Sequence, residues 1–271
     1  MRHFYIVIHP TAIVHPKAKL DSSVRVGPYA VIDDGVELGA DCVVGPHVYL
    51  TGLTTIGAHN LFHAGCVIGD APQDLKYRDE PTRLRIGDHN VFREHFTVHR
   101  STKPDTDTVI GSHNFLMINA HVAHNCIIGD HVILANGALL GGHVVVQDRA
   151  FISGNCLVHQ FTRVGTLALM QGGSAISQDL PPFTVALRVN ELCGLNSVGL
   201  RRAGFTAEQR LELKKLYHLL FRSGKNQREA ITGARKIFTG AAAKALLDFI
   251  SNAKHGVCAD SGRAAGKREE E

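Results

Sequence analysis

Apolar residues recur at every sixth position along most of the chain. From Ile8 to Ile176 these positions are aliphatic, phenylalanine or methionine, except at Asp74, Glu80 and Pro104. A period of six fits neither the 3.6-residue repeat of a helix nor the alternation of a flat strand. It predicts short units that each turn the chain in the same direction, which is a β-solenoid.

Each six-residue unit pairs a large residue with a small one. Glycine directly follows the periodic residue in ten units, which suits a close approach between backbones. The fourth residue after it is usually small, so large and small side chains can stack inside a narrow parallel coil. Four of the six cysteines take this small position and are interpreted as core residues rather than disulfide or zinc ligands: Cys42, Cys66, Cys126 and Cys156.

Two interruptions of the period predict loops that leave the coil without changing its register. They lie near residues 70–85 and 103–108 and span two units and one unit. Loops on a rigid scaffold often carry functional residues. We therefore expect part of the site on these two segments.

The period of six ends near Pro182, and a helical pattern follows. We expect a parallel coil over residues 1–190 and a small α-helical domain over residues 191–258 that covers its open end. Thr206 and Gln209 form a capping-box signature before a helix, and two further helices are expected over 227–238 and 241–253. The polar tail 259–271 is expected to be disordered.

Composition narrows the class of protein. No apolar run approaches the length of about 18 residues that a membrane span requires, and the run ending at Ile8 is too short for a signal peptide. We expect a cytoplasmic protein with no stable membrane insertion and no nucleic-acid partner. The cations Arg188, Arg201 and Arg202 beyond the coil could meet an acidic protein or a phosphorylated ligand, or form an ordinary solvated surface.

Seventeen histidines are present, and the repeat indicates which of them meet. With turns of eighteen residues, His124, His143 and His159 fall at the ninth, tenth and eighth places of successive turns. They should line one edge, with layers about 5 Å apart. Three interpretations remain open from the residues alone: scattered surface histidines, a zinc site, or a general base of near-neutral pKa.

Several segments together are more specific than the repeat. They are 121–125 (HVAHN), 140–143 (LGGH), 158–161 (VHQF), 178–182 (QDLPP), 73–77 (QDLKY), 80–84 (EPTRL) and 196–202 (NSVGLRR). This combination closely resembles the bacterial UDP-N-acetylglucosamine 3-O-acyltransferases that begin lipid A synthesis. The match runs from the first repeat to the helical cap.

The resemblance implies a fold, an assembly and a reaction. The fold would be a left-handed parallel β-helix, and the protein a homotrimer with sites between adjacent subunits. A fatty acyl group, often 3-hydroxylated, would move from the phosphopantetheine thioester of acyl carrier protein to the 3-hydroxyl of UDP-N-acetylglucosamine. No metal or other cofactor would be required.

The resemblance also implies site residues. His124 corresponds to the family's general base, and the backbone N–H of Gly142 to its oxyanion donor, which suits hydroxyl attack on a thioester. The remaining positions would bind substrate: Asp74 and Lys76 the sugar; His121, His143, His159 and Gln160 the nucleotide-sugar cleft; Asn196 and Arg202 the uridine or the pantetheine arm; and Gly172 the acyl chain.

Three positions depart from the family pattern. Asn125 stands where an aspartate usually follows the base, Val198 where a glutamate is common, and Ala203 where a second arginine is common. An amide can orient an imidazole, but it stabilises the imidazolium charge less than a carboxylate does.

Rival functions belong to several classes. The N-acyltransferase of the same pathway shares the coil but carries an N-terminal uridine-binding domain, for which a repeat that begins at residue 8 is expected to leave no room. Stoichiometric zinc would instead favour a hexapeptide-repeat carbonic anhydrase. A non-catalytic scaffold would leave the stacked histidines without a purpose. Direct transfer is favoured over a covalent intermediate, because no cysteine or serine is indicated as a nucleophile.

Overall fold

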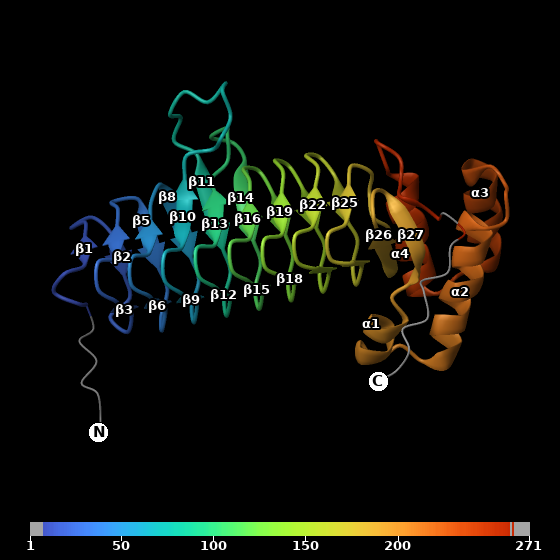
Figure 1. The fold of residues 1–271 in the computed structure, drawn as a ribbon, viewed down its shortest axis with the longest axis horizontal. Coiled ribbons are helices and arrows are strands. Elements are labelled where there is room, and N and C mark those ends of the chain that lie inside the picture. Colours follow the sequence, from blue (N-terminus) through green and yellow to red (C-terminus); the bar gives the residue numbers. More distant parts are fainter. Residues whose placement is uncertain (1–7, 261, 263–271) are drawn as a thin grey trace.

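The computed structural model describes residues 8–260 and residue 262. Short parallel strands wind around one axis and form three sheets, which are the sides of a triangular prism (Figure 1). Consecutive strands of the coil lie in different sheets, and each strand pairs with the equivalent strand one turn away. The predicted solenoid is confirmed.

The strands of the coil are mostly two residues long, and their bounds follow the period of six. The first sheet has nine strands: β1 (Ile13–Val14), β4 (Val31–Ile32), β7 (Tyr49–Leu50), β10 (Val67–Asp70), β13 (Thr97–His99), β16 (His121–Val122), β19 (Leu139–Leu140), β22 (Leu157–Val158) and β25 (Ala175–Ile176). The second has eight: β2 (Lys19–Leu20), β5 (Val36–Leu38), β8 (Leu53–Ile56), β11 (Arg83–Ile86), β14 (Asp107–Ile110), β17 (Ile127–Ile128), β20 (Val145–Val146) and β23 (Arg163–Val164).

The third sheet continues past the coil and has eleven strands: β3 (Arg25–Val26), β6 (Val43–Val44), β9 (Leu61–Phe62), β12 (Val91–Phe92), β15 (Phe115–Leu116), β18 (Ile133–Leu134), β21 (Phe151–Ile152), β24 (Leu169–Met170), β26 (Thr184–Leu187), β27 (Glu191–Leu195) and β28 (Ala259–Asp260). Within the described residues, β26 and β27 form the only antiparallel pair of this sheet, and β28 runs parallel to β27.

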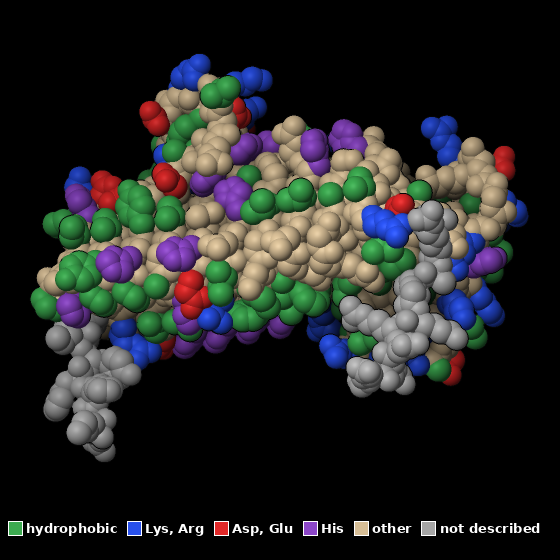
Figure 2. Space-filling view, viewed as in Figure 1, with side chains coloured by type: hydrophobic (Ala, Val, Ile, Leu, Met, Phe, Trp, Pro, Cys, Tyr) green, Lys and Arg blue, Asp and Glu red, His purple; other side chains and the backbone are tan. Residues whose placement is uncertain are grey.

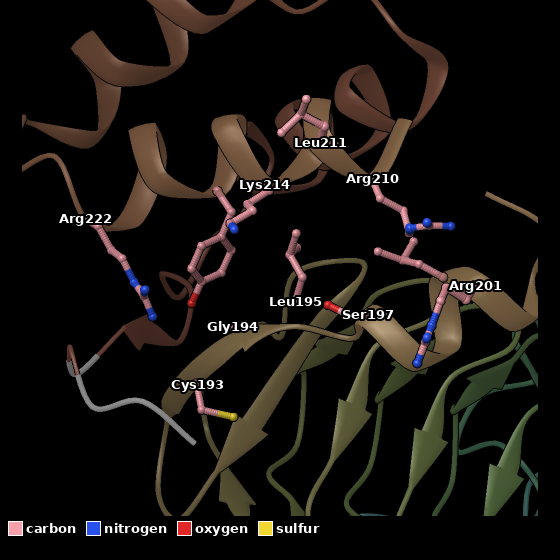
Figure 3. A pocket seen from close by; sticks show the side chains of 11 residues that line it. Cys193, Gly194, Leu195, Ser197, Arg201, Arg210, Leu211, Lys214 and Arg222 are labelled. Carbon is pink, nitrogen blue, oxygen red and sulfur yellow. The ribbon is translucent and has the colours of Figure 1, made fainter. Parts of the chain in front are cut away.

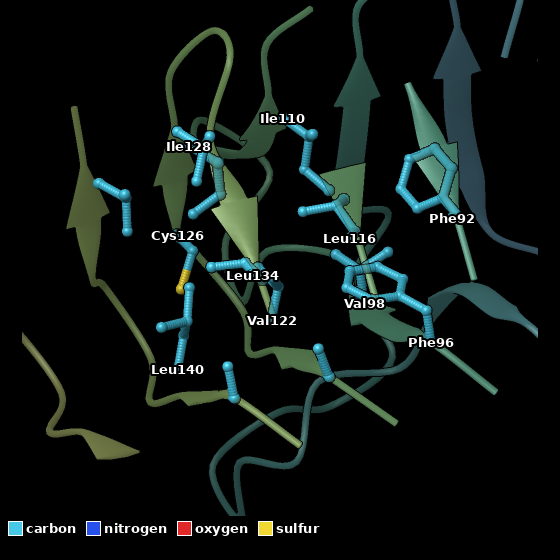
Figure 4. Close-up of a cluster of buried hydrophobic side chains, with 14 of the residues drawn as sticks. Phe92, Phe96, Val98, Ile110, Leu116, Val122, Cys126, Ile128, Leu134 and Leu140 are labelled. Carbon is cyan, nitrogen blue, oxygen red and sulfur yellow. The ribbon is translucent and has the colours of Figure 1, made fainter. Parts of the chain in front are cut away.

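The periodic residues form the core of the coil. Val122 pairs with Leu140, and Leu140 pairs with Val158, so the register advances by eighteen residues per turn. Phe92, Leu116 and Leu134 point inward in Figure 4 and are fully buried. Full burial of such side chains contributes about 1.5–3 kcal/mol each. The four cysteines expected in the small position are buried with free thiols.

Both expected loops leave the coil at the same edge. Leu53 pairs with Arg83, thirty residues later, which is one turn of eighteen plus two units of six. Arg83 pairs with Asp107, twenty-four residues later, which is one turn plus one unit. The insertions therefore change neither the register nor the direction of any side chain in the following turns.

The corner between the second and third sheets carries two ladders. Inside, the Asn90 side chain donates from Nδ2 to Asn60 Oδ1 at 3.0 Å, and its oxygen accepts the Asn114 backbone N–H at 2.9 Å. Outside, four exposed imidazoles stack at 4.5 to 4.9 Å between centroids. They belong to His59, His89, His113 and His131.

In the described part of the chain, four helices follow the coil and lie at its C-terminal end (Figure 1). They are α1 (Ser197–Arg202), α2 (Ala207–Phe221), α3 (Gln227–Ile237) and α4 (Ala241–Ser251). The capping box of Thr206 and Gln209 is confirmed at the start of α2. Leu167 and Phe183 of the coil pack with buried leucines of the helices, so one apolar cluster joins the two parts.

Three features differ from expectation. Residues 191–195 were expected in the helical domain, whereas they form β27 and extend the third sheet. The short helix α1 was not expected, because its six residues include Gly199 and show no apolar period. The tail was expected to lose structure from residue 259, whereas Ala259 and Asp260 form β28 beside β27. This strand is held because Tyr217 and Arg222 bind the Asp260 carboxylate at 2.6 and 2.7 Å. Residues 261 and 263–271 of the predicted tail lie outside the described residues.

Candidate active site

The segments that join the first sheet to the second form one edge of the prism, called here the loop-bearing corner. From β10 to β23 it comprises residues 71–82, 100–106, 123–126, 141–144 and 159–162. Figure 2 shows histidine side chains along the edge from which the extruded loop rises. Most of the site residues expected from the sequence lie at or beside this corner.

His124, His143 and His159 lie at this one corner, as the repeat predicts, but their rings do not form one column. The rings of His124 and His143 meet edge to face, with centroids 5.4 Å apart. His143 stacks on Phe161 at 4.6 Å, because the eighteen-residue register places these two residues in line. His159 is exposed, and its Nδ1 lies 3.2 Å from the Gln160 carbonyl. The exposed Gln160 is next to it at the same corner.

The imidazole of His124 is fixed on two sides. Its Nδ1 lies 2.9 Å from Oδ1 of Asn125. On the next turn, Gly142 lies beneath the ring, and a Cβ atom added there would be 2.6 Å from Cε1 of His124. Residue 142 must therefore lack a side chain if the ring is to keep this position. Nε2 of His124 makes no hydrogen bond among those of the described residues, so it is available to a ligand.

Two further histidines lie behind His124. His121 bonds Oγ1 of Thr97 through Nδ1 at 2.7 Å, and its ring meets that of His99 edge-on at 4.8 Å. Burial lowers the pKa of His121 to about 4, and the charges of His99 and His124 act in the same direction. Burial also lowers the pKa of His99 and that of His143. These three imidazoles are therefore neutral near pH 7.

His99 was missed in the sequence. It is 7% exposed, and its Nδ1 has no hydrogen-bond partner within the described part of the chain. It ends β13 at the point where the second loop begins, so its position depends on how that loop leaves the coil. The only signal in the sequence is its place one residue after the periodic Val98.

The first extruded loop brings Asp74 toward the corner. Arg100 anchors this loop, since its guanidinium bonds the Tyr77 hydroxyl at 3.2 Å and the Gly69 carbonyl at 3.0 Å. Asp74 is close enough to His143 for its charge to oppose the lowering of that pKa. Lys76 lies two residues further along, and its side chain is exposed. The backbone N–H of Lys76 donates to Oδ1 of Asp74 at 2.9 Å.

The other expected residues lie elsewhere in the chain. Gly172 is at the corner between the third and first sheets, where an added Cβ would meet only the Gly154 carbonyl at 3.6 Å. Asn196 and Arg202 flank a cavity of 310 Å³ over the third sheet. The Asn196 side chain accepts from the Gly199 N–H and donates to the Leu167 carbonyl, both at 2.9 Å, so it caps α1. One chain therefore does not gather all of these residues.

A basic cavity of 580 Å³ lies between β27 and α2 (Figure 3). Arg201, Arg210 and Lys214 line one part of it, and Arg222 lines another. The Asp260 carboxylate neutralises Arg222 through an ion pair of 2.7 Å. The sequence predicted cations in this region but not the cavity that they share.

The described residues were also searched for metal-binding and membrane-spanning features. Nowhere in 8–260 and 262 do three or more His, Cys, Asp or Glu side chains converge as metal ligands would. Each helix of that part of the chain is too short or too polar to cross a bilayer.

The chain is similar to proteins of one named activity. Residues 179–258 match the family described as Udp N-acetylglucosamine O-acyltransferase, domain 2, and residues 17–52 and 107–142 match the bacterial transferase hexapeptide family. The acyl-[acyl-carrier-protein]–UDP-N-acetylglucosamine O-acyltransferase of Syntrophobacter fumaroxidans is 48% identical over 92% of this chain and 98% of its own length. That of Halorhodospira halophila is 47% identical over the same shares.

Solved structures agree with these relatives. The UDP-N-acetylglucosamine acyltransferase of Francisella novicida superposes with a TM-score of 0.90 at 33% identity, covering 97% of this chain and all of that one. The enzyme of Campylobacter jejuni gives 0.88 at 32% identity over 93% and 99%. These structures are left-handed parallel β-helices, and a close superposition requires the same hand. The expected left-handed coil with a small helical part is confirmed.

Proposed function

The chain belongs to the acyl-[acyl-carrier-protein]–UDP-N-acetylglucosamine O-acyltransferase family, and from this membership we propose how its residues share the work of acyl transfer. The enzyme moves an acyl group from acyl carrier protein to UDP-N-acetylglucosamine, the first step of lipid A synthesis. This membership, rather than any absence in the structure, separates the chain from zinc-dependent carbonic anhydrases. The acceptor atom that we propose is the 3-hydroxyl oxygen of the sugar.

His124 is the general base of the proposed mechanism. A sugar hydroxyl is a poor nucleophile near pH 7, so a base must remove its proton as the oxygen attacks the thioester carbon. The fixed ring of His124 and its available Nε2 support this assignment. The C–O bond forms, the thiolate of phosphopantetheine leaves, and the imidazolium of His124 returns the proton to it. Transfer is direct, with no acyl-enzyme.

Gly142 stabilises the charge that develops on the thioester oxygen. Gly142 lies next to the His124 ring, and in this proposal its backbone N–H supplies one oxyanion donor. No cofactor is required in this proposal, because the donor already arrives as a thioester.

The other residues bind substrate. Asp74 and Lys76 hold the sugar, and the nucleotide-sugar cleft is lined by His121, His143, His159 and Gln160. Arg202 meets the uridine or the pantetheine arm, and Asn196 supports Arg202 by capping α1. Gly172 leaves room for the acyl chain.

We further propose a homotrimer whose sites lie between subunits. Support comes from the separation of the binding residues: His124 is at the loop-bearing corner, whereas Arg202 is over the third sheet, on another side of the prism. A site that uses both residues therefore needs a second copy of the chain. The reaction is assigned to the cytoplasm, and the six free cysteines suit a reducing compartment.

The observation that carries the mechanism is the fixed His124 ring above Gly142. The test is transfer from acyl-loaded carrier protein to UDP-N-acetylglucosamine, followed by mass spectrometry. His124→Ala should lower the rate about 10²- to 10⁴-fold, the usual contribution of a general base. His131→Asn is the matched control, because His131 is an exposed histidine at another corner. Equal rates for the two variants would remove the assignment.

A further inference from the structure

The second extruded loop places threonines around Asn125. Oδ1 of Asn125 lies 3.1 Å from the Thr102 backbone nitrogen and 2.9 Å from Thr102 Oγ1. Nδ2 of Asn125 lies 2.9 Å from Oγ1 of Thr106. The Asn125 N–H donates to Oγ1 of Thr108 at 2.7 Å. Asn125 is 9% exposed, so these bonds form with little competition from water.

These bonds determine which way the amide points. A backbone N–H only donates, so the Asn125 atom that faces the Thr102 nitrogen is the oxygen. The Thr106 hydroxyl already donates to the Lys103 carbonyl at 3.0 Å, so it can accept only from an N–H, which is Nδ2. Both ends of the amide are therefore fixed by different atoms of the same loop.

The amide orientation fixes the tautomer of His124. An amide oxygen cannot donate, so the 2.9 Å contact between Asn125 Oδ1 and His124 Nδ1 requires the hydrogen to be on Nδ1. A neutral imidazole that carries its proton on Nδ1 has a lone pair on Nε2. That nitrogen is the one that must accept a proton in the proposed mechanism.

From this geometry we infer that Thr102 and Thr106 are positioning residues, which hold the Asn125 amide so that His124 presents a basic Nε2. This inference rests on the proposed role of His124 as the base. It assigns a purpose to the loop of residues 100–106 beyond the anchoring of the first loop by Arg100. The base is thus oriented by neutral hydrogen bonds, where family members commonly use a carboxylate.

The charges around His124 make the effect of this neutrality measurable. His99 and His121 lie behind it, and His143 faces it from the next turn. The charge of Asp74 raises the pKa of His143 and that of Lys103 lowers it. Asp70 and Arg100 have the same opposing effects on the pKa of His99. A carboxylate at position 125 would instead lie within hydrogen-bond distance of Nδ1 of His124 itself.

The first test removes both hydroxyls. The double variant Thr102→Val/Thr106→Val should lower kcat about tenfold or more with an unchanged KM for UDP-N-acetylglucosamine, since a freely turning amide admits the wrong tautomer. The matched variant Thr102→Ser/Thr106→Ser keeps both hydroxyls and should stay within about twofold of the parent. The inference would be overturned if the double valine variant were as active as the double serine variant, or if the double serine variant were as slow as the double valine variant.

The second test changes the charge and also applies if the valine pair does not fold. Asn125→Asp should shift the acid limb of the kcat/KM profile to higher pH by about one unit, because a carboxylate stabilises the imidazolium. An unmoved limb would contradict the orientation of Nδ1–H toward residue 125. If His124→Ala is slow and Thr102→Val/Thr106→Val is fully active, the proposed function stands and only the positioning role of the two threonines is refuted. A fully active His124→Ala would refute both.

Discussion

At the scale of single residues, backbone conformation accounts for many of the histidines. Among the histidines of residues 8–260, seven have φ between 55° and 61°, and all seven lie at the third position after a periodic residue. This left-handed conformation favours Asn, Asp and His among residues with a side chain. His47, His59 and His131 are of this kind, whereas His99, His121 and His124 are not. The place of a histidine within the period of six therefore indicates this conformation, whereas the contacts of His99, His121 and His124 depend on how the turns stack.

Gly142 gives the first prediction at this scale. In Gly142→Ala the new Cβ must displace the His124 ring, and a displacement of about 1 Å can cost about 10²-fold in rate. We expect kcat to fall by that order while the melting temperature changes by only a few degrees. Initial rates and circular dichroism check this, and a rate within threefold of the parent would show that the ring does not rest on residue 142.

His121 gives a prediction for pH. Its pKa is about 4 when folded and about 6.5 when unfolded, so on acidification the unfolded chain takes up a proton first. The stability that this group supports is complete above about pH 6.5 and is lost as the pH falls toward 4. The urea midpoint should therefore decrease over this window, and His121→Asn should reduce the slope. Parallel curves for the two proteins would contradict the assignment.

At the scale of elements, the period of six predicted the sheets, their register and both loops, because a single repeated constraint acts on each turn. The helices α2, α3 and α4 were predicted from caps and apolar spacing. The helix α1 was not predicted, because its six residues are too few to show a helical spacing of apolar residues. An Asn196 cap and a tertiary contact hold it instead. The clamp on Asn125 was also unpredictable, because it depends on how the loop of 100–106 folds back.

The asparagine ladder gives the prediction for elements. Asn90 is fully buried and bonds Asn60 in the preceding turn and Asn114 and the Gly111 carbonyl in the following turn, so Asn90→Ala leaves the Asn114 N–H and the Gly111 carbonyl without these partners. We expect the free energy of unfolding to fall by about 2–4 kcal/mol. Denaturant titration measures this, with the exposed Asn136→Ala as the control that should change it by less than about 0.5 kcal/mol.

At the scale of the whole molecule, the prism keeps the residues proposed for one reaction on different sides. His124 and Asp74 share the loop-bearing corner, whereas Gly172 and Arg202 do not. The resemblance predicted which residues matter, but a single chain cannot bring them together, since the sheets of a rigid coil do not bend toward one another. The period of six leaves the assembly open, and the homotrimer is expected from the family resemblance alone.

Mixing inactive variants tests this arrangement. If each site takes His124 from one subunit and Arg202 from the next, co-refolded His124→Ala and Arg202→Ala chains should regain about a quarter of the parent activity, because three quarters of random trimers hold one intact site of three. Each variant refolded alone should stay inactive. A mixture with no recovery, at a confirmed trimer mass, would place both residues in the same subunit's site.

The whole-unit length of the first loop has a practical consequence. Lys76 and Arg78 lie on its tip next to Leu75, which is 97% exposed, and the strands on both sides of the loop remain hydrogen-bonded to other turns. Brief trypsin digestion should therefore cut the backbone there and leave two fragments that co-elute in gel filtration but separate in denaturing electrophoresis. The enzyme could then be assembled from two separately expressed polypeptides, divided at this point.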